Sequence, residues 1–216
     1  MKKNLFKSLI VALSTVLISF SSGAQALMQG NFVVDAYYGF PNIGRSFSQS
    51  VEDANTGGNN FKAGGIGPAG LRLEYMIADR VGIGADVIYN SNIIKFSAVD
   101  STYNGTTDTW STQTNEYKYI MQRVRAQVRL NYHFDIASPD FDSYIGVGAG
   151  TNNRFRKTLE NGVDITENDG LANFTLLPFS MRFALGARYY FSQNVGLNME
   201  IGLGGPVISA GLSIKL

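Results

Sequence analysis

Apolar and polar residues alternate with a period of two along most of the chain. Between Val124 and Phe134, apolar residues occupy the even positions and polar residues, two of them arginines, occupy the odd ones. A helix would distribute these charges around its circumference, whereas an extended strand separates them onto two faces. The same alternation recurs over 179–191 and 208–216. The pattern therefore predicts long β-strands with one apolar and one polar face.

Continued along the chain, the alternation predicts eight strands, several of them longer than the five or six residues typical of soluble sheets. Their approximate ranges are 31–40, 65–77, 81–95, 116–134, 143–156, 173–191, 195–204 and 206–216. Short connections at 78–80, 135–142 and 192–194 alternate with long polar ones at 41–64, 96–115 and 157–172. The last hairpin turns tightly through Gly204, Gly205 and Pro206. Short turns at one end and long loops at the other predict an all-β fold, an eight-stranded antiparallel up-and-down barrel.

The first residues have the pattern of a secretory signal peptide. Three lysines within the first seven residues precede an apolar stretch over 9–20, and Ala24-Gln25-Ala26 supplies a small-residue cleavage site. A dozen apolar residues is too short for a spanning helix, which needs about 20. We expect residues 1–26 to be removed on export and residues 27–216 to form the barrel domain.

Composition narrows the chemistry that the chain can perform. Among 216 residues there is no cysteine, one histidine (His133) and only 16% charged residues. The absence of cysteine excludes thiol catalysis, disulfide scaffolds and cysteine-ligated zinc. The near-neutral net charge of +1 gives no electrostatic reason to expect a nucleic-acid partner. We predict neither a metal ion nor another cofactor.

Two features favour a barrel whose apolar face meets lipid. The polar face is rich in glycine, which suits a narrow interior beside large side chains but weakens an exposed strand. Aromatic residues mark the strand ends on the apolar face, as in the two girdles of a membrane barrel. They are Tyr38, Phe40, Tyr75, Tyr89, Tyr132, Phe134, Tyr189 and Phe191. The alternative is a soluble lipocalin-like carrier with the apolar face lining a ligand cavity.

Three runs of the sequence resemble the small outer-membrane β-barrels of the OmpA/OmpX/Ail type. They are the opening run 35–42, the run 186–191, and the closing segment from Ile201 to Leu216. The resemblance implies a Gram-negative outer-membrane location and a structural or envelope-integrity role, with surface loops available for binding or adhesion. A typical member ends in Phe, whereas this chain ends in Leu216, at the strand that the barrel-assembly machinery recognises.

Strand parity directs eleven charged side chains into the predicted lumen. They are Asp35, Arg72, Glu74, Asp86, Arg123, Arg125, Arg129, Arg182, Arg188, Glu200 and Lys215. Buried charges need partners, and the planar arginine fork suits carboxylates. We therefore expect Glu74, Asp86 and Glu200 to bridge several arginines and close the lumen. The excess of bases leaves a second hypothesis open, an ion gate in a narrow, anion-preferring pore.

The sequence lacks a recognisable catalytic arrangement. His133 lies beside a short turn without a serine two positions on, and we expect an interior or rim histidine. The acids of the third long loop do not have the spacing of a calcium-binding loop. We therefore predict a non-enzymatic, monomeric outer-membrane protein. Its expected partners are outer-membrane lipid and lipopolysaccharide, the barrel-assembly machinery, and an extracellular ligand at the loops.

Overall fold

The computed structural model describes residues 26–42, 46, 50, 60–136, 138–166 and 178–216. Residues 1–25 of the predicted signal peptide lie outside the described residues, as do most of the first long loop and residues 167–177. In the part of the chain that is described, no helix has the length and apolar character needed to cross a membrane.

Eight long strands and two short ones make up the described structure. The long strands are β1 (Phe32–Phe40), β3 (Ala69–Ala78), β4 (Val81–Asn104), β5 (Thr109–His133), β6 (Phe141–Glu160), β8 (Phe179–Tyr190), β9 (Val195–Leu203) and β10 (Ile208–Lys215). The short strands are β2 (Lys62–Gly64), which pairs with β4, and β7 (Val163–Asp164), which pairs with β6.

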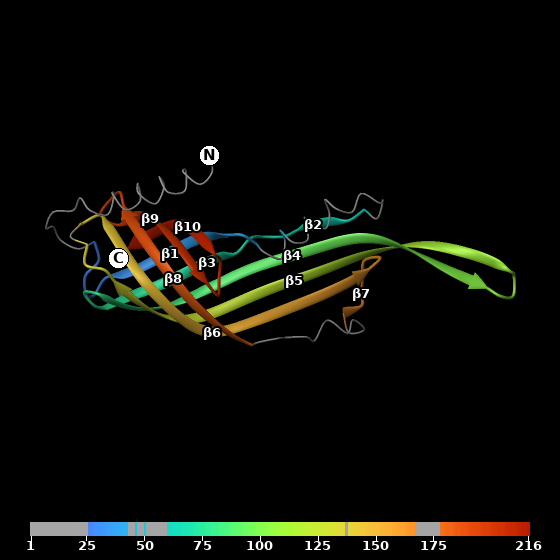
Figure 1. Ribbon diagram of the computed structural model, residues 1–216, viewed down its shortest axis with the longest axis horizontal. Coiled ribbons are helices and arrows are strands. Elements are labelled where there is room, and N and C mark those ends of the chain that lie inside the picture. Colours follow the sequence, from blue (N-terminus) through green and yellow to red (C-terminus); the bar gives the residue numbers. More distant parts are fainter. Residues whose placement is uncertain (1–25, 43–45, 47–49, 51–59, 137, 167–177) are drawn as a thin grey trace, which may run out of the picture.

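The eight long strands close into a barrel. Each pairs antiparallel with the preceding and following long strand, and β1 pairs with β10, from Val33 opposite Lys215 to Phe40 opposite Ile208. In Figure 1, these strands form the compact part of the molecule, from which β4 and β5 continue to one side. The predicted all-β, eight-stranded up-and-down barrel is confirmed.

The two faces of each strand lie in opposite environments. On β5, Val128 and Leu130 are exposed, whereas Gln127, Arg129 and Asn131 are almost completely buried. A continuous belt of exposed apolar side chains around a polar interior is the inverse of a soluble protein and the arrangement of a membrane barrel. A one-residue slip of a strand would exchange the two faces, so this pattern fixes the register.

The prediction of a long loop at 96–115 is wrong. Strands β4 and β5 continue as a two-stranded ribbon, paired from Lys95 opposite Lys118 to Asn104 opposite Thr109. Residues 96–104 and 109–116 form the long projection in Figure 1. We call them the extracellular ribbon, because membrane barrels of this kind carry their longer connections on the extracellular side. Both faces of a projecting ribbon meet water, so its strands carry no apolar alternation that the sequence could show.

Smaller differences concern the other long connections. The predicted strand 65–77 begins only at Ala69, and the loop before it contains β2. The loop predicted from residue 157 begins later, because β6 continues to Glu160 and pairs with β7. The predicted strand 173–191 is described from Phe179, and residues 173–177 lie outside the described residues.

Candidate functional site in the barrel lumen

The inward faces of the strands bring a dense group of charged side chains together. Eight of the eleven predicted lumen residues have exposed fractions of 1% or less; these are Asp35, Arg72, Glu74, Asp86, Arg129, Arg182, Arg188 and Glu200. We call these eight, with His133 and Asp142, the lumen network. Its members are held in place because each stands at an inward position of a paired strand, at a height set by the register.

Glu200, on β9, lies at the centre of the network. Its carboxylate accepts from Arg72 at 2.7 Å, from Arg129 at 2.5 Å and from Arg182 at 2.5 Å. The three arginines stand on β3, β5 and β8. One carboxylate therefore connects four strands across the lumen.

Asp35 and Asp86 hold the neighbouring arginines. Asp35 accepts from Arg72 at 3.1 Å, from Arg188 at 2.9 Å and from the Ser213 hydroxyl on β10 at 2.5 Å. Asp86 accepts from Arg129 at 3.1 Å and from the Tyr37 hydroxyl at 2.5 Å. Most of these are charge-assisted hydrogen bonds, which are stronger than neutral ones.

A second group lies toward the short-turn end of the barrel. Arg188 donates to Glu74 at 2.6 Å and to Asp142 at 3.0 Å. The ring of His133 lies between the same two acids, with Nδ1 2.7 Å from Asp142 and Nε2 3.0 Å from Glu74. Asp142 is not among the predicted lumen residues, because it falls in the short connection expected at 135–142. The inward parity of Gly146 and Gly148 on the same strand is the signal that would have included it.

Two tyrosine rings fill the space between the ion pairs. The Arg188 guanidinium lies 4.5 Å from the Tyr144 ring centroid, and the Arg72 guanidinium lies 4.8 Å from that of Tyr37. Each ring lies against a glycine, Tyr144 over Gly186 and Tyr37 over Gly70, where a Cβ atom would collide with the ring. These glycines leave room for aromatic rings and arginines in a narrow lumen.

The three remaining predicted lumen residues lie outside the network. Arg123 and Arg125 are half-buried on the loop side of it, and Arg123 stands directly opposite Arg154 of β6. Within the described residues, no carboxylate lies within 4.0 Å of the guanidinium groups of Arg123, Arg125 or Arg154. We call them the vestibule arginines. Lys215, at the opposite end, donates to the carbonyl of Ala26 at 3.0 Å and lies over the ring of Tyr190.

The predicted girdle residues lie on the outward face. Seven of the eight are exposed, namely Tyr38, Phe40, Tyr75, Tyr132, Phe134, Tyr189 and Phe191. Tyr89 is half-buried, and its hydroxyl accepts from Gln122 at 3.0 Å. The strand-end positions on β1, β3, β5 and β8 place these rings where an apolar belt meets water.

The arrangement is suited to closing the lumen. Each of the four guanidinium groups of the lumen network contacts at least one carboxylate. All eight long strands contribute a side chain to this arrangement, if Asp142 on β6 and Ser213 on β10 are included. Among the residues that the structure describes, no group of three or more His, Asp or Glu side chains is placed to hold a metal ion.

The apolar belt, closed strand order and polar interior define a transmembrane β-barrel. Residues 12–207 match the family described as outer membrane protein beta-barrel domain, and the chain belongs to this family. It is an outer-membrane β-barrel protein of the Gram-negative envelope, with lipid around its apolar belt.

Solved barrels show low overall similarity to this chain. The outer membrane protein OprG of Pseudomonas aeruginosa has 15% identity and a TM-score of 0.42, over 89% of this chain and 98% of that one. Outer membrane protein W of E. coli has 17% identity and a TM-score of 0.42, over 88% and 99%. Ail of Yersinia pestis has 9% identity and a TM-score of 0.32, over 87% and 96%. No curated protein sequence matches the chain.

Proposed function

We propose that this protein is a closed, non-enzymatic scaffold of the outer membrane that presents the extracellular ribbon as a binding or adhesion surface. The lumen network is the observation that carries the proposal. It occupies the lumen with nine arginine–carboxylate contacts that are almost inaccessible to solvent. Removing one partner of a buried ion pair costs about 3–5 kcal/mol, so an opening that separates several pairs together is strongly disfavoured.

The exposed end of the ribbon supports the binding part of the proposal. Tyr103 and Trp110 stand opposite each other near its tip, with ring centroids 5.2 Å apart and both side chains exposed. Tyrosine and tryptophan are the residues that most often dominate protein interfaces. Outside the bilayer, such a pair has no role in anchoring the barrel.

Export and assembly belong to the same proposal. A cleaved signal peptide over residues 1–26 would deliver the barrel domain, residues 27–216, to the periplasm. The barrel-assembly machinery would then insert it through the last strand, β10. Both edges of β10 are paired, to β1 and to β9, which favours a monomer because no barrel edge is left for a second copy.

A narrow anion-preferring pore is the second candidate function. The vestibule arginines favour it, because three cations on the loop side of the lumen attract anions toward the barrel axis. In this alternative, the lumen network is a gate that rearranges to conduct. Arg129 and Arg182 would then influence ion selectivity directly.

Single-channel conductance of the refolded protein in a planar bilayer tests both candidates. For the closed scaffold, we expect no discrete steps from protein whose folding has been checked by heat-modifiable gel migration. Reproducible anion-selective steps that change on Arg129→Gln or Arg182→Gln substitution would overturn the scaffold and establish the pore.

Attachment of whole cells tests the ribbon separately. A variant in which a tight turn replaces residues 98–113 keeps the barrel, and Trp110→Ala removes one ring. We expect both to reduce attachment of expressing cells to a mucin-coated surface while detergent resistance of the envelope stays unchanged. Unchanged attachment with a weakened envelope would favour a purely structural protein.

A further inference from the structure

Two arginines stand directly opposite each other on the inward face of the barrel, on the loop side of the lumen network. Arg123 of β5 pairs with Arg154 of β6, and on its other side Arg123 pairs with Asn90 of β4. Arg125, two residues nearer the lumen network on β5, has the same inward parity. The vestibule arginines therefore lie on two neighbouring strands, in two successive inward rows.

The positive charge of the vestibule arginines is not compensated in the described part of the chain. No carboxylate there lies within 4.0 Å of their guanidinium groups, and the buried Nε atoms of Arg125 and Arg154 have no hydrogen-bond partner there. The arginines of the lumen network differ, because each of them contacts a carboxylate. Like charges directly opposite each other destabilise a sheet. The pair of Arg123 and Arg154 is therefore unfavourable unless an anion lies beside it.

A small pocket lies at this pair. Asn90, Arg123 and Arg154 are among its lining residues, and its volume is about 150 Å³. That is the volume of about five water molecules, and it is below the roughly 300 Å³ at which pockets for drug-sized ligands begin. Among the described residues, no carboxylate lines the pocket. The pocket therefore has room and N–H donors for one small anion.

The donors around the pocket favour a doubly charged tetrahedral oxyanion. The planar guanidinium fork matches pairs of phosphate or carboxylate oxygens. Electrostatic attraction grows with the charge of the anion, and a phosphate group carries about −1.5 to −2 at pH 7, more than a carboxylate or chloride. Its oxygens point in different directions, so they can accept from arginines on two strands and from the Asn90 amide together. A carboxylate has two oxygens in one plane and satisfies fewer of these donors.

We propose that the vestibule arginines form a binding site for a phosphate or sulfate group that enters the barrel from the loop side. Arg123 and Arg154 hold the oxyanion from two strands, Asn90 donates from its amide, and Arg125 adds its charge from the network side. The lumen network does not compete for the anion, because its arginines already contact carboxylates. The site requires neither conduction nor a ligand at the extracellular ribbon, so its failure leaves the closed scaffold untouched.

Calorimetric titration of the folded, detergent-solubilised protein with phosphate and with sulfate in a low-salt buffer tests the site. A hydrogen bond to a charged group contributes about ten-fold in affinity. We expect Arg123→Gln and Arg154→Gln each to weaken binding of both anions by about that factor. The triple variant, which also carries Arg125→Gln, should bind them at least about a hundred-fold more weakly than the wild type. Acetate, with a single charge and a planar group, should bind the wild type about ten-fold more weakly than phosphate.

Glucose 1-phosphate distinguishes a free ion from a phosphate group carried by a larger ligand. Binding at least ten-fold tighter than that of inorganic phosphate assigns the site to a larger ligand whose phosphate group enters the pocket. Equal or weaker binding assigns it to the free ion. In both cases the triple variant should lose the binding, because the same arginines hold the phosphate group.

Unfolding in urea supplies a second measurement. In buffer without phosphate or sulfate, the triple variant should be at least as stable as the wild type, because the substitutions remove two opposed charges. Phosphate should raise the unfolding midpoint of the wild type and not that of the triple variant, since a ligand stabilises only the folded state that binds it. A phosphate effect of equal size in both proteins would contradict the proposal.

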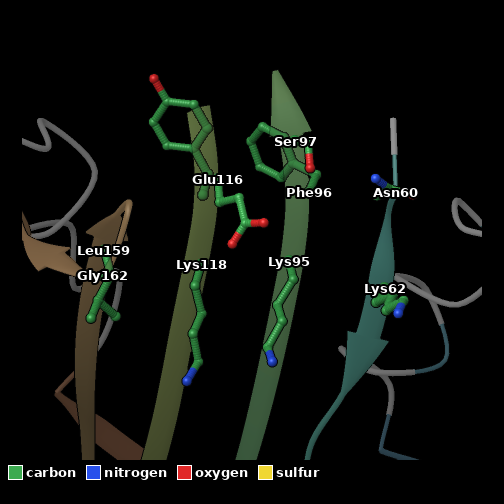
Figure 2. Close-up of a pocket in the computed structure, with 10 residues that line it drawn as sticks. Asn60, Lys62, Lys95, Phe96, Ser97, Glu116, Lys118, Leu159 and Gly162 are labelled. Atoms are coloured by element: carbon green, nitrogen blue, oxygen red, sulfur yellow. The ribbon is translucent and has the colours of Figure 1, made fainter. Parts of the chain in front are cut away.

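The variant with Lys95→Gln and Lys118→Gln is the matched control, because it removes two charges from β4 and β5 on their outward face. Figure 2 shows these two lysine side chains running parallel on the neighbouring strands. Its affinity for phosphate should lie within two-fold of that of the wild type. The proposal is overturned if the folded triple variant also binds phosphate within two-fold of the wild type, or if acetate binds as tightly as phosphate. It is equally overturned if the lysine variant loses as much affinity as the triple variant, because the attraction would then come from net charge and not from a site.

Discussion

Replacement of Glu200 by glutamine removes the charge that connects three arginines in the lumen. After the change, Arg72 still has Asp35 at 3.1 Å, and Arg129 still has Asp86 at 3.1 Å. Arg182 has only the carbonyl of Pro206, at 3.4 Å, among the described residues. Glu200→Gln therefore leaves one guanidinium buried without a counter-charge.

The expected loss of stability follows from that single unpaired charge. Breaking a buried ion pair by removing one partner costs about 3–5 kcal/mol. With a urea m-value of about 2 kcal/mol/M, the unfolding midpoint should fall by about 1.5–2.5 M. The pair Glu200→Gln and Arg182→Met should be less destabilised than Glu200→Gln alone, because methionine removes the unpaired charge at similar volume.

Urea unfolding in lipid vesicles, followed by the loss of β-sheet circular dichroism and by gel mobility, measures these changes. The exposed pair of Arg80 and Asp135 supplies the control, since Asp135→Asn should change the free energy of unfolding by less than about 1 kcal/mol. A Glu200→Gln barrel within about 1 kcal/mol of the wild type would refute the reasoning. So would a double variant that is no more stable than Glu200→Gln.

Three further predictions concern packing, facing and titration. Gly186→Val should destabilise the barrel by about 1–3 kcal/mol, measured by the same unfolding assay, because its side chain collides with the Tyr144 ring. Val128→Arg should cost about 2–4 kcal/mol in vesicle refolding, because it places a charge near the middle of the lipid-facing belt. The pKa of the Asp164 carboxyl should lie below its ordinary value of 3.8, because Thr166 donates to it from its hydroxyl and its amide. The ionised Asp164 carboxylate stabilises the folded protein at pH values above 3.8, and this contribution is lost as the pH falls through the lowered pKa. Thr166→Val should raise the pKa of Asp164 in a carbon NMR titration.

The sequence predicted the barrel because burial has a period of two in every strand. If β5 were turned by one residue, Arg129 would point into lipid. The alternation of apolar and polar residues therefore determines which side chains of β5 face the lipid and which face the lumen. The same reasoning assigned Asp35 and Glu200 to the lumen. It could not assign partners, because parity gives the face of a strand and not the relative height of side chains on different strands.

Because parity does not give the height of a side chain along the barrel, the predicted lumen residues fall into two groups in the structure, the lumen network and the residues outside it. Arg125 and Arg129 have the same parity, but four residues of rise separate the network from the vestibule. Asp142 was missed for a related reason, since strand ends lack the repeated alternation that would extend the pattern. The extracellular ribbon was missed because its composition, rich in Ser, Thr and Asn, is shared by solvated strands and loops.

The extracellular ribbon is subject to fewer structural constraints than the barrel, whose residues must keep the strand register and the lumen network. Eleven residues of β4 follow Ile93, which at 3.3 Å per residue extends about 35 Å. Residues 97–104 pair with residues 109–116, Phe96 pairs with Tyr117, and residues 96–104 and 109–116 pair with no strand of the described chain other than β4 and β5. Substitutions near the tip therefore do not disturb the register or the lumen network, and insertions between Gly105 and Asp108 should be tolerated. The sequence of the projecting tip can thus change without a compensating change in the barrel that anchors it.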